Sequence, residues 1–187
     1  LHAITYNPQT HETIEFLPVE SFFWLEPNSM TAEGQMHLGQ VCLYPRPAFQ
    51  ALLDWVLPKY RGNRPGLRVV QAGPMPELPQ MLGLPLGGVR HEGAGLKVEY
   101  SEGGVLLDEE FYGVVTYQQN GTQTNWGFAN LLSFRAAQGQ LESLRSTFWD
   151  VARSRQMNPA YEQVCAQIYQ QLAQGFAVHI QQGYQQI

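Results

Sequence analysis

The sequence predicts an α+β fold in which helices flank a mainly antiparallel sheet, an arrangement known as an α/β/α sandwich. One observation is the run of three strand-like segments between residues 95 and 134, which are joined by short polar turns. Consecutive strands with such turns form an antiparallel meander. A second observation is that helix-like segments, with apolar residues three and four positions apart, lie on both sides of this run along the chain. We therefore expect a domain over residues 1–158 and a long amphipathic helix over residues 159–187.

The first third of the chain predicts short strands followed by a helix. Turn-forming residues separate the first two strand-like segments, so the chain is expected to begin with a β-hairpin. Pro47 begins the helix, because a proline fits the first helical turn, where its missing N–H is not needed. The helix is expected to end before a loop that starts at Arg61. The expected strands cover residues 1–6, 13–17, 21–25 and 40–44.

The middle of the chain predicts the meander. Residues 76–82 are expected to form a short helix. Residues 84–95 are expected to form a flexible glycine-rich loop, and they lack the Lys-Ser/Thr pair of a phosphate-binding loop. The run Glu102-Gly103-Gly104 is typical of a hairpin turn. The expected strands cover residues 67–72, 95–100, 109–117 and 126–134.

Two helices are predicted for the last third. The first carries an apolar stripe from Leu141 to Ala152 and is expected to end around Asn158-Pro159. The second, over residues 159–187, has an apolar stripe opposite a face rich in glutamine. An uncharged polar face is soluble without a partner, but it also suits a contact between copies of the chain or with another protein. Both interpretations stay open at this point.

Length and charge narrow the class of protein. The chain has 187 residues, and 11 Lys and Arg residues against 16 Asp and Glu residues give it a formal net charge of −5. An acidic chain lacks the positive field that binding to a nucleic-acid backbone requires, so no nucleic-acid partner is expected. No apolar run approaches the roughly 20 residues of a membrane-spanning helix, so no membrane span is expected either.

The first residue and the cysteines bear on the compartment. The chain starts at Leu1, so we expect either a removed N-terminal segment, such as a signal peptide with or without a lipid anchor, or an origin within a longer polypeptide. Cys42 lies in a strand-like segment and Cys165 in a helix-like one. The two cysteines would pair in an oxidising compartment, or they are two buried thiols. A periplasmic, cell-surface or secreted protein is expected, with an intracellular accessory domain as the alternative.

No motif of a known catalytic class is present. The five histidines are scattered singly along the chain, so we expect no metal site and no cofactor. His91 and Glu92, together with the acidic run Asp108-Glu109-Glu110, are the candidates for a hydrolase site. Hairpin turns are ordinarily exposed to solvent, so these acidic residues are expected to be solvated rather than catalytic.

Arginines and aromatic residues supply the candidates for binding. Arg61 and Arg64 lie in one expected loop, where they suit an anion or an acidic surface, although such residues are also common in soluble loops. Adjacent aromatic residues cannot all face inward from a strand, because neighbours point to opposite faces. Helices on both faces would bury most of them, or they would line an apolar groove for a ligand or peptide. The candidate ligand-binding or partner-binding residues are Trp24, Trp126, Phe128, Trp149, Arg61 and Arg64.

One segment resembles a known group of proteins. The run Phe134-Arg135-Ala136, closed by Gly139 and followed by a helix, Asn158-Pro159 and a glutamine-rich helix, resembles uncharacterised bacterial exported proteins and lipoproteins. This strand–turn–helix ending is also similar to the fold of the photosystem subunit PsbP and the Ran-binding Mog proteins. The resemblance implies an assembly or binding protein without catalytic residues. We therefore expect a non-enzymatic extracytoplasmic protein that binds an unknown protein or small ligand, with a hydrolase as the alternative.

Overall fold

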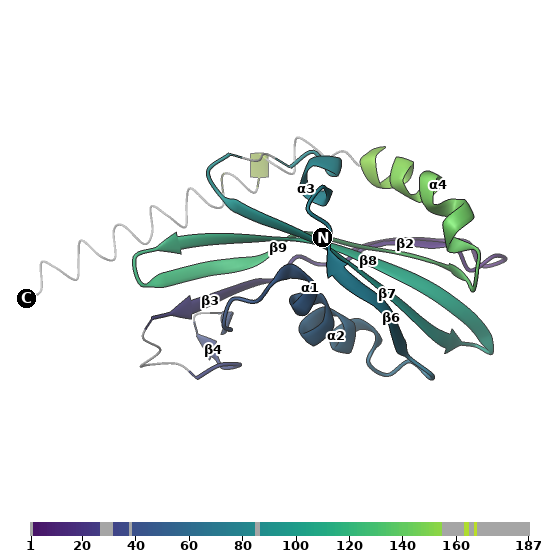
Figure 1. The fold of residues 1–187 in the computed structure, drawn as a ribbon, viewed down its shortest axis with the longest axis horizontal. Helices are drawn as coiled ribbons and strands as arrows, with labels where there is room; N and C mark the ends of the chain where they lie inside the picture. The colour runs from purple at the N-terminus through teal and green to yellow at the C-terminus, as the bar shows by residue number, and fades with distance from the viewer. Residues whose placement is uncertain are drawn as a thin grey trace, which may run out of the picture. The chain divides into compact units, whose positions relative to one another are not determined.

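The structure, a computed structural model, describes residues 2–26, 32–37, 39–84, 87–154, 163–164 and 167. Leu1–Ala152 form one compact unit, and Arg153–Ile187 form a second. The described residues build a nine-stranded sheet with a few helices (Figure 1). The strands are β1 (Ala3–Tyr6), β2 (Thr13–Phe16), β3 (Ser21–Leu25), β4 (Met36–His37), β5 (Gln40–Cys42), β6 (Arg68–Pro74), β7 (Arg90–Glu102), β8 (Val105–Asn120) and β9 (Gln123–Ala137). The helical segments are α1 (Ala48–Ala51), η1 (Leu52–Val56), α2 (Leu57–Arg61), α3 (Leu78–Met81) and α4 (Leu141–Ser154).

The sheet is mainly antiparallel, which confirms the predicted sheet-dominated α+β class. Its strand order is β4-β5-β3-β9-β8-β7-β6, while β2 also pairs with β9 and β1 pairs with β2. The pairing of β3 with β5 is parallel, and the other pairings are antiparallel. The predicted meander is formed by β7, β8 and β9, the longest strands described.

The turn between β7 and β8 has the backbone that its sequence predicts. Glu102 pairs with Val105, so the loop has two residues, Gly103 and Gly104. Their φ angles are 59° and 83°. Two successive positive φ values give the turn a twist that matches the right-handed twist of the flanking strands, and glycine adopts them without strain.

Two short strands share the outer edge of β9. The segment Leu132–Arg135 pairs with β2, and Gln123–Gly127 pairs with β3. Between these pairings, the Phe128 N–H donates a 2.8 Å hydrogen bond to the carbonyl oxygen of Glu20. The chain therefore stays hydrogen-bonded to the same edge of β9 as it passes from β2 to β3.

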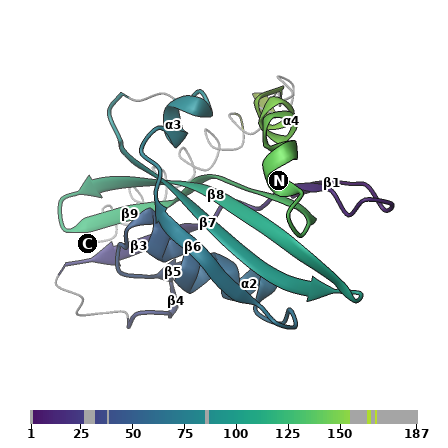
Figure 2. The same cartoon turned by 45° about the vertical axis from the view of Figure 1, so that its right-hand side comes forward.

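Helices lie on both faces of the sheet (Figures 1 and 2). The segment 48–61 packs on one face, which we call the α1–α2 face, over a core that includes Phe111 and Phe128. On the other face, the α4 face, α3 and α4 pack over a second core that includes Tyr112 and Phe134. Because successive side chains of β8 point to opposite faces, Phe111 and Tyr112 belong to different cores.

Residues 48–61 are helical throughout, as predicted from Pro47, but the helix widens in the middle to a π-helical turn over Leu52–Val56. Pro58 accounts for this turn, because it has no N–H to donate to the carbonyl oxygen four residues earlier. The helix still buries an apolar stripe, since Leu52 and Val56 are fully buried against the sheet. Arg61 is the last residue of α2 rather than the first of a loop.

The prediction of a glycine-rich loop over 84–95 is wrong for its second half, because residues 90–95 belong to β7. Gly93 is needed there for packing: a Cβ atom at this position would lie 2.2 Å from the Met75 carbonyl oxygen. Gly93 therefore indicates a close approach between two segments, which local sequence patterns do not distinguish from a flexible loop.

The two predicted C-terminal helices have different outcomes. The first is present as α4, which the structure describes as far as Ser154. The long glutamine-rich helix expected over 159–187 lies outside the described residues, apart from 163, 164 and 167, and it stays a prediction. The same holds for Cys165 and for its pairing with Cys42.

Candidate functional site

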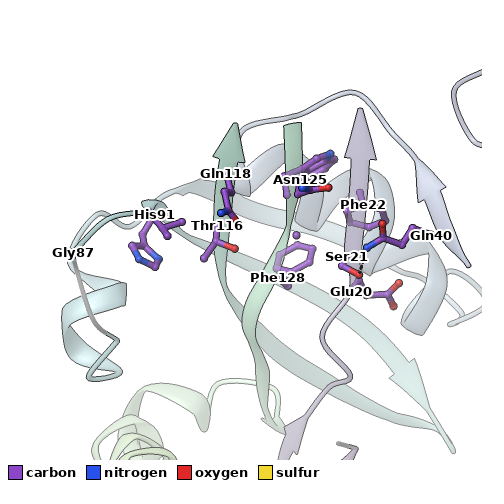
Figure 3. Close-up of a pocket in the computed structure, with 13 residues that line it drawn as sticks. Glu20, Ser21, Phe22, Gln40, Gly87, His91, Thr116, Gln118, Asn125 and Phe128 are labelled. Atoms are coloured by element: carbon purple, nitrogen blue, oxygen red, sulfur yellow. Dashed lines mark hydrogen bonds between the residues drawn. The ribbon is translucent and has the colours of Figure 1, made fainter. Parts of the chain in front are cut away.

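A hollow of about 340 Å³ lies where β3, β7, β8 and β9 run side by side (Figure 3). It opens on the α4 face of the sheet. Its central residues, Thr116 and Gly127, directly follow Val115 and Trp126, whose side chains lie in the core of the α1–α2 face. Successive residues of a strand point to opposite faces, so Thr116 and Gly127 face the other way. We call it the Gly127 hollow. The residues that line it are Glu20, Ser21, Phe22, Gln40, Gly87, Val89, His91, Thr116, Gln118, Asn125, Trp126, Gly127 and Phe128.

A row of cross-strand neighbours forms the floor of the hollow. Ser21 pairs with Gly127, Gly127 with Thr116, and Thr116 with His91, so the row crosses all four strands. Gly127 contributes no side chain at the centre of this row. A Cβ atom there would lie 2.1 Å from the carbonyl oxygen of Glu20, so the close approach of β3 to β9 requires glycine. The same requirement leaves the middle of the row open.

Neutral amide and hydroxyl groups surround this opening. Gln118 and Asn125 face each other across β8 and β9. On the other side, the Gln40 side-chain amide donates a 3.4 Å hydrogen bond to the Ser21 hydroxyl. His91 lies at the far end of the row (Figure 3), and its Nδ1 atom is buried without a hydrogen-bond partner. The hollow therefore offers both donors and acceptors to a ligand.

The single carboxylate of the lining is held by the helix over 48–61. Glu20 accepts hydrogen bonds from Trp55 Nε1 and from the Tyr60 hydroxyl, both at 3.1 Å, and it forms an ion pair with Lys59. Burial, together with the nearby Glu20 carboxylate, raises the pKa of Tyr60 to about 12, so this hydroxyl stays a donor at neutral pH. Because Lys59 balances the charge of Glu20, the hollow is close to neutral.

The hydrolase candidates do not form a catalytic arrangement. His91 and Glu92 are adjacent on β7, so their side chains point to opposite faces. Glu92 accepts hydrogen bonds from the Tyr117 hydroxyl at 3.0 Å and from the Ala48 N–H at 3.2 Å, which fix α1 to the sheet. The hydrogen bonds of Glu92 therefore hold it on the α1–α2 face, away from His91.

Of the predicted aromatic candidates, Trp126 and Phe128 line the Gly127 hollow. Each is 3% exposed, and the Trp126 Nε1 donates a 2.7 Å hydrogen bond to the Leu43 carbonyl oxygen. Trp149 lies elsewhere, in the core of the α4 face. Trp24 lies near the end of β3, where its ring meets that of Tyr44 edge to face with centroids 5.2 Å apart. The four aromatic candidates thus do not form one site.

The two arginine candidates differ in exposure. Arg61 is 5% exposed and forms ion pairs with Glu109 and Glu15, so the expectation of a solvent-accessible loop residue is wrong. Burial by itself would lower the pKa of Arg61, but the two carboxylates outweigh burial and raise it. The Arg64 side chain is 30% exposed and pairs with Glu102 at 2.6 Å. Only Arg64 remains accessible to a partner.

The expectation of a solvated acidic run is also wrong. Asp108, Glu109 and Glu110 are 4%, 0% and 7% exposed. They lie within β8, which is covered on both faces, and each has a cation nearby from a distant segment: Lys97, Arg61 and Arg145, respectively. Buried carboxylates are tolerated when such partners are present.

Sequence reasoning did not select Gly127, Gln118 or Asn125 as site residues. A signal is nevertheless present, because polar and apolar residues alternate at the ends of β8 and β9. Thr116 and Gln118 flank the aromatic Tyr117, and Asn125 and Gly127 flank Trp126. Such alternation predicts a sheet that is aromatic on one face and polar on the other.

No helix in the described part of the chain is both long and apolar enough to cross a membrane. No group of three His, Cys, Asp or Glu side chains among the same residues could hold a metal ion.

Comparison with known proteins gives little more. No protein-family model matches the chain, and no curated protein matches it. A solved structure of a protein of unknown function from Pseudomonas aeruginosa, PA94, is similar over 85% of this chain and 85% of its own, with 7% sequence identity and a TM-score of 0.41. A likeness at this level supports no inference about the function of this chain.

Proposed function

We propose that this protein is a non-enzymatic binding protein and that the Gly127 hollow holds a neutral ligand rich in hydroxyl or amide groups. The observation that carries the proposal is the composition of the hollow. Its accessible polar groups are amides, hydroxyls and an imidazole, and its single carboxylate is engaged by Lys59, Trp55 and Tyr60. Amide side chains donate and accept at once, so they recognise neutral polar groups without a net charge.

The helices on both faces of the sheet support the proposed likeness to the PsbP and Mog type of sandwich. The proteins of that group suggested by the sequence are binding or assembly proteins. Fold analogy is compatible with many functions, so the hollow rather than the fold carries the proposal.

A titration followed by two-dimensional ¹H–¹⁵N NMR tests the ligand class. The probes are N-acetylglucosamine, maltose and the neutral peptide N-acetyl-glycyl-glycinamide. We expect at least one probe to shift the side-chain NH₂ resonances of Gln118 and Asn125 saturably. The variant Gln118→Leu should weaken this binding, because the hollow loses both a donor and an acceptor. Gln119→Leu is the matched control, because the neighbouring residue points to the other face.

Two outcomes would contradict the proposal. One is that none of the three probes shifts Gln118 or Asn125. The other is catalysis: hydrolysis of p-nitrophenyl esters or glycosides by the native chain that is lost in His91→Ala would favour the hydrolase alternative. We expect that neither the native chain nor the His91→Ala variant hydrolyses these substrates.

We also propose an extracytoplasmic location, which rests on the resemblance stated above. Cys42 is buried, and burial raises the pKa of its thiol, which suits a structural role rather than a nucleophilic one. Mass spectrometry of the protein isolated from its native cells without reduction tests the compartment. A Cys42–Cys165 bridge would support export, whereas two reduced thiols would favour the intracellular alternative.

A further inference from the structure

A second hollow, also of about 340 Å³, lies on the α4 face between β6, β7, β8 and α4. Its floor is another row of cross-strand neighbours, in which Gly73 pairs with Gly95 and Gly95 pairs with Tyr112. We call it the Gly73–Gly95 recess. Two adjacent glycines leave a bare patch of backbone on the sheet face beside the Tyr112 ring.

Packing does not explain these two glycines. A Cβ atom at Gly73 would meet no atom within 4 Å, and at Gly95 it would only touch the Tyr112 ring at 3.9 Å. Neither residue has a positive φ angle. Gly93, two positions before Gly95, shows the contrast, because a Cβ atom there would lie 2.2 Å from a carbonyl oxygen. What Gly73 and Gly95 provide is room above the sheet.

The recess has an apolar wall. The rings of Tyr112 and Trp149 meet with centroids 4.8 Å apart and planes inclined by 61°. Both side chains are mostly buried, at 7% and 6% exposed. A flat backbone floor next to two aromatic rings suits a planar apolar group, because such a group contacts the floor with one face and the rings with its edge.

Two cationic side chains in the lining keep unused hydrogen-bond donors. Lys97 Nζ lies 4.0 Å from the nearest carboxylate oxygen, that of Asp108, and within the described part of the chain Lys97 makes no hydrogen bond. Arg145 uses its terminal nitrogens on Glu110 and Glu142, while its Nε atom is buried without a partner.

The carboxylates of the recess are less available than these donors. Glu110 is 7% exposed, and its two oxygens accept hydrogen bonds from Arg145 and from the Tyr112 hydroxyl, at 2.8 and 2.6 Å. Glu77 lies at the exposed rim. The inner carboxylate of the recess is therefore engaged, whereas Lys97 keeps unused donors, which favours an anionic oxygen on the ligand.

From the bare glycine floor, the aromatic wall and the two unused cationic donors, we propose that the Gly73–Gly95 recess binds a small aromatic carboxylate. The ring of the ligand lies over Gly73 and Gly95, and its carboxylate accepts a hydrogen bond from Lys97 beside the positive charge of the Arg145 guanidinium. This site is separate from the Gly127 hollow, which is lined by other residues and has no cation with free donors.

Phenylacetate and its neutral analogue phenylacetamide test the proposal. In ¹H–¹⁵N NMR titrations of the full chain, phenylacetate should shift the backbone amides of Gly73 and Gly95 and the indole N–H of Trp149 saturably. Phenylacetamide should bind about tenfold more weakly, because it lacks the charge that Lys97 and Arg145 recognise. The Gln118 and Asn125 resonances should stay in place, so failure of this site and failure of the Gly127 hollow give different results.

Two variants separate the ring from the carboxylate. Gly73→Val fills part of the recess with a side chain whose Cβ atom meets no neighbour within 4 Å, so the protein should fold and phenylacetate binding should be lost. Lys97→Met should fold and weaken phenylacetate by about tenfold while leaving phenylacetamide unchanged. Arg68→Met is the control, because Arg68 lies on the same face one row beyond Lys97, where it pairs with Glu99. The proposal is overturned if phenylacetate shifts none of the three resonances, or if a folded Gly73→Val protein binds it as the native chain does.

Discussion

The Arg61 guanidinium donates two hydrogen bonds of 2.8 Å to Glu109, from Nε to one carboxylate oxygen and from Nη2 to the other. Glu109 has no exposed surface and lies in the middle of β8, whereas Arg61 ends α2. The Tyr100 hydroxyl also donates to Glu109, at 2.8 Å. A bidentate pair of this kind fixes both distance and orientation, so it ties the end of the helix to one point of the sheet.

The first prediction concerns this pair. Arg61→Met should lower the free energy of unfolding by about 3–5 kcal/mol, because it leaves the buried charge of Glu109 without its hydrogen-bonded cation. Arg64→Met should cost less than about 1 kcal/mol, since the pair of Arg64 with Glu102 is partly exposed. Urea unfolding followed by circular dichroism measures both values. Equal small losses in the two variants would show that Arg61 does not hold the helix in place.

The second prediction concerns acid stability and Glu15. Burial by itself would raise the pKa of Glu15, but the charge of Arg61 and hydrogen bonds from Arg61 and His2 outweigh it and hold this pKa below its ordinary value of 4.5. The ionised carboxylate thus favours the folded state. This contribution is present above pH 4.5 and is lost as the pH falls through the lower folded-state pKa.

Urea midpoints measured from neutral pH to below pH 4.5 check this sign. The native chain should lose stability in acid, and Glu15→Gln should lose less over the same interval, because it has no carboxylate to protonate. Glu142→Gln is the control, since that side chain is 76% exposed, and its acid profile should follow that of the native chain. A Glu15→Gln profile parallel to the native one would contradict the assignment.

These carboxylates show where sequence reasoning stops. The sequence correctly predicts a strand here and helices on both faces of the sheet, but it does not show which residues of those helices lie over Glu109 and Glu110, so it places both carboxylates in water. Their partners, Arg61 and Arg145, come from α2 and α4, which lie 48 and 35 positions away. Local patterns carry no information about such pairs, because the fold alone brings them together.

Glycine is the other source of error. In residues 90–95 glycine predicts a loop, although Gly93 permits the close packing of Met75 against β7. The sequence predicts the candidate site only in part for the same reason. Aromatic character identifies Trp126 and Phe128, whereas the opening beside them depends on Gly127 and on the polar residues of the opposite face. An absent side chain leaves no chemical signal in a single sequence.

The third prediction tests the requirement for Gly127. Gly127→Ala should destabilise the protein by about 1–3 kcal/mol, because the added methyl group would overlap the Glu20 carbonyl oxygen and push β3 away from β9. Gly73→Ala should change stability by less than about 0.5 kcal/mol, since nothing lies within 4 Å of its Cβ position. Thermal unfolding of the two variants compares them directly. A Gly127→Ala protein as stable as Gly73→Ala would mean that β3 can shift at no cost.

The fourth prediction separates two tryptophans that the sequence treats alike. Trp126 packs against Phe22 with ring centroids 4.7 Å apart, and its Nε1 donates to the Leu43 carbonyl oxygen inside the core. Trp126→Phe should cost about 1–3 kcal/mol, because it leaves a buried acceptor without this donor and opens a small cavity. Trp24 donates to Glu26 at an exposed position, so Trp24→Phe should cost less than about 1 kcal/mol.

Fluorescence quenching by acrylamide gives an independent check on this difference. Trp24 is partly exposed, so its removal should reduce the fraction of the emission that acrylamide quenches readily, whereas removal of the 3% exposed Trp126 should raise that fraction, because only emission from a buried ring is lost. If Trp24→Phe instead unfolds the chain, the contact between the Trp24 and Tyr44 rings is part of the core that stabilises the fold. If the variant is stable and only the accessible emission is lost, Trp24 has no large role in stability, and the surface it shares with Tyr44 remains available to a partner.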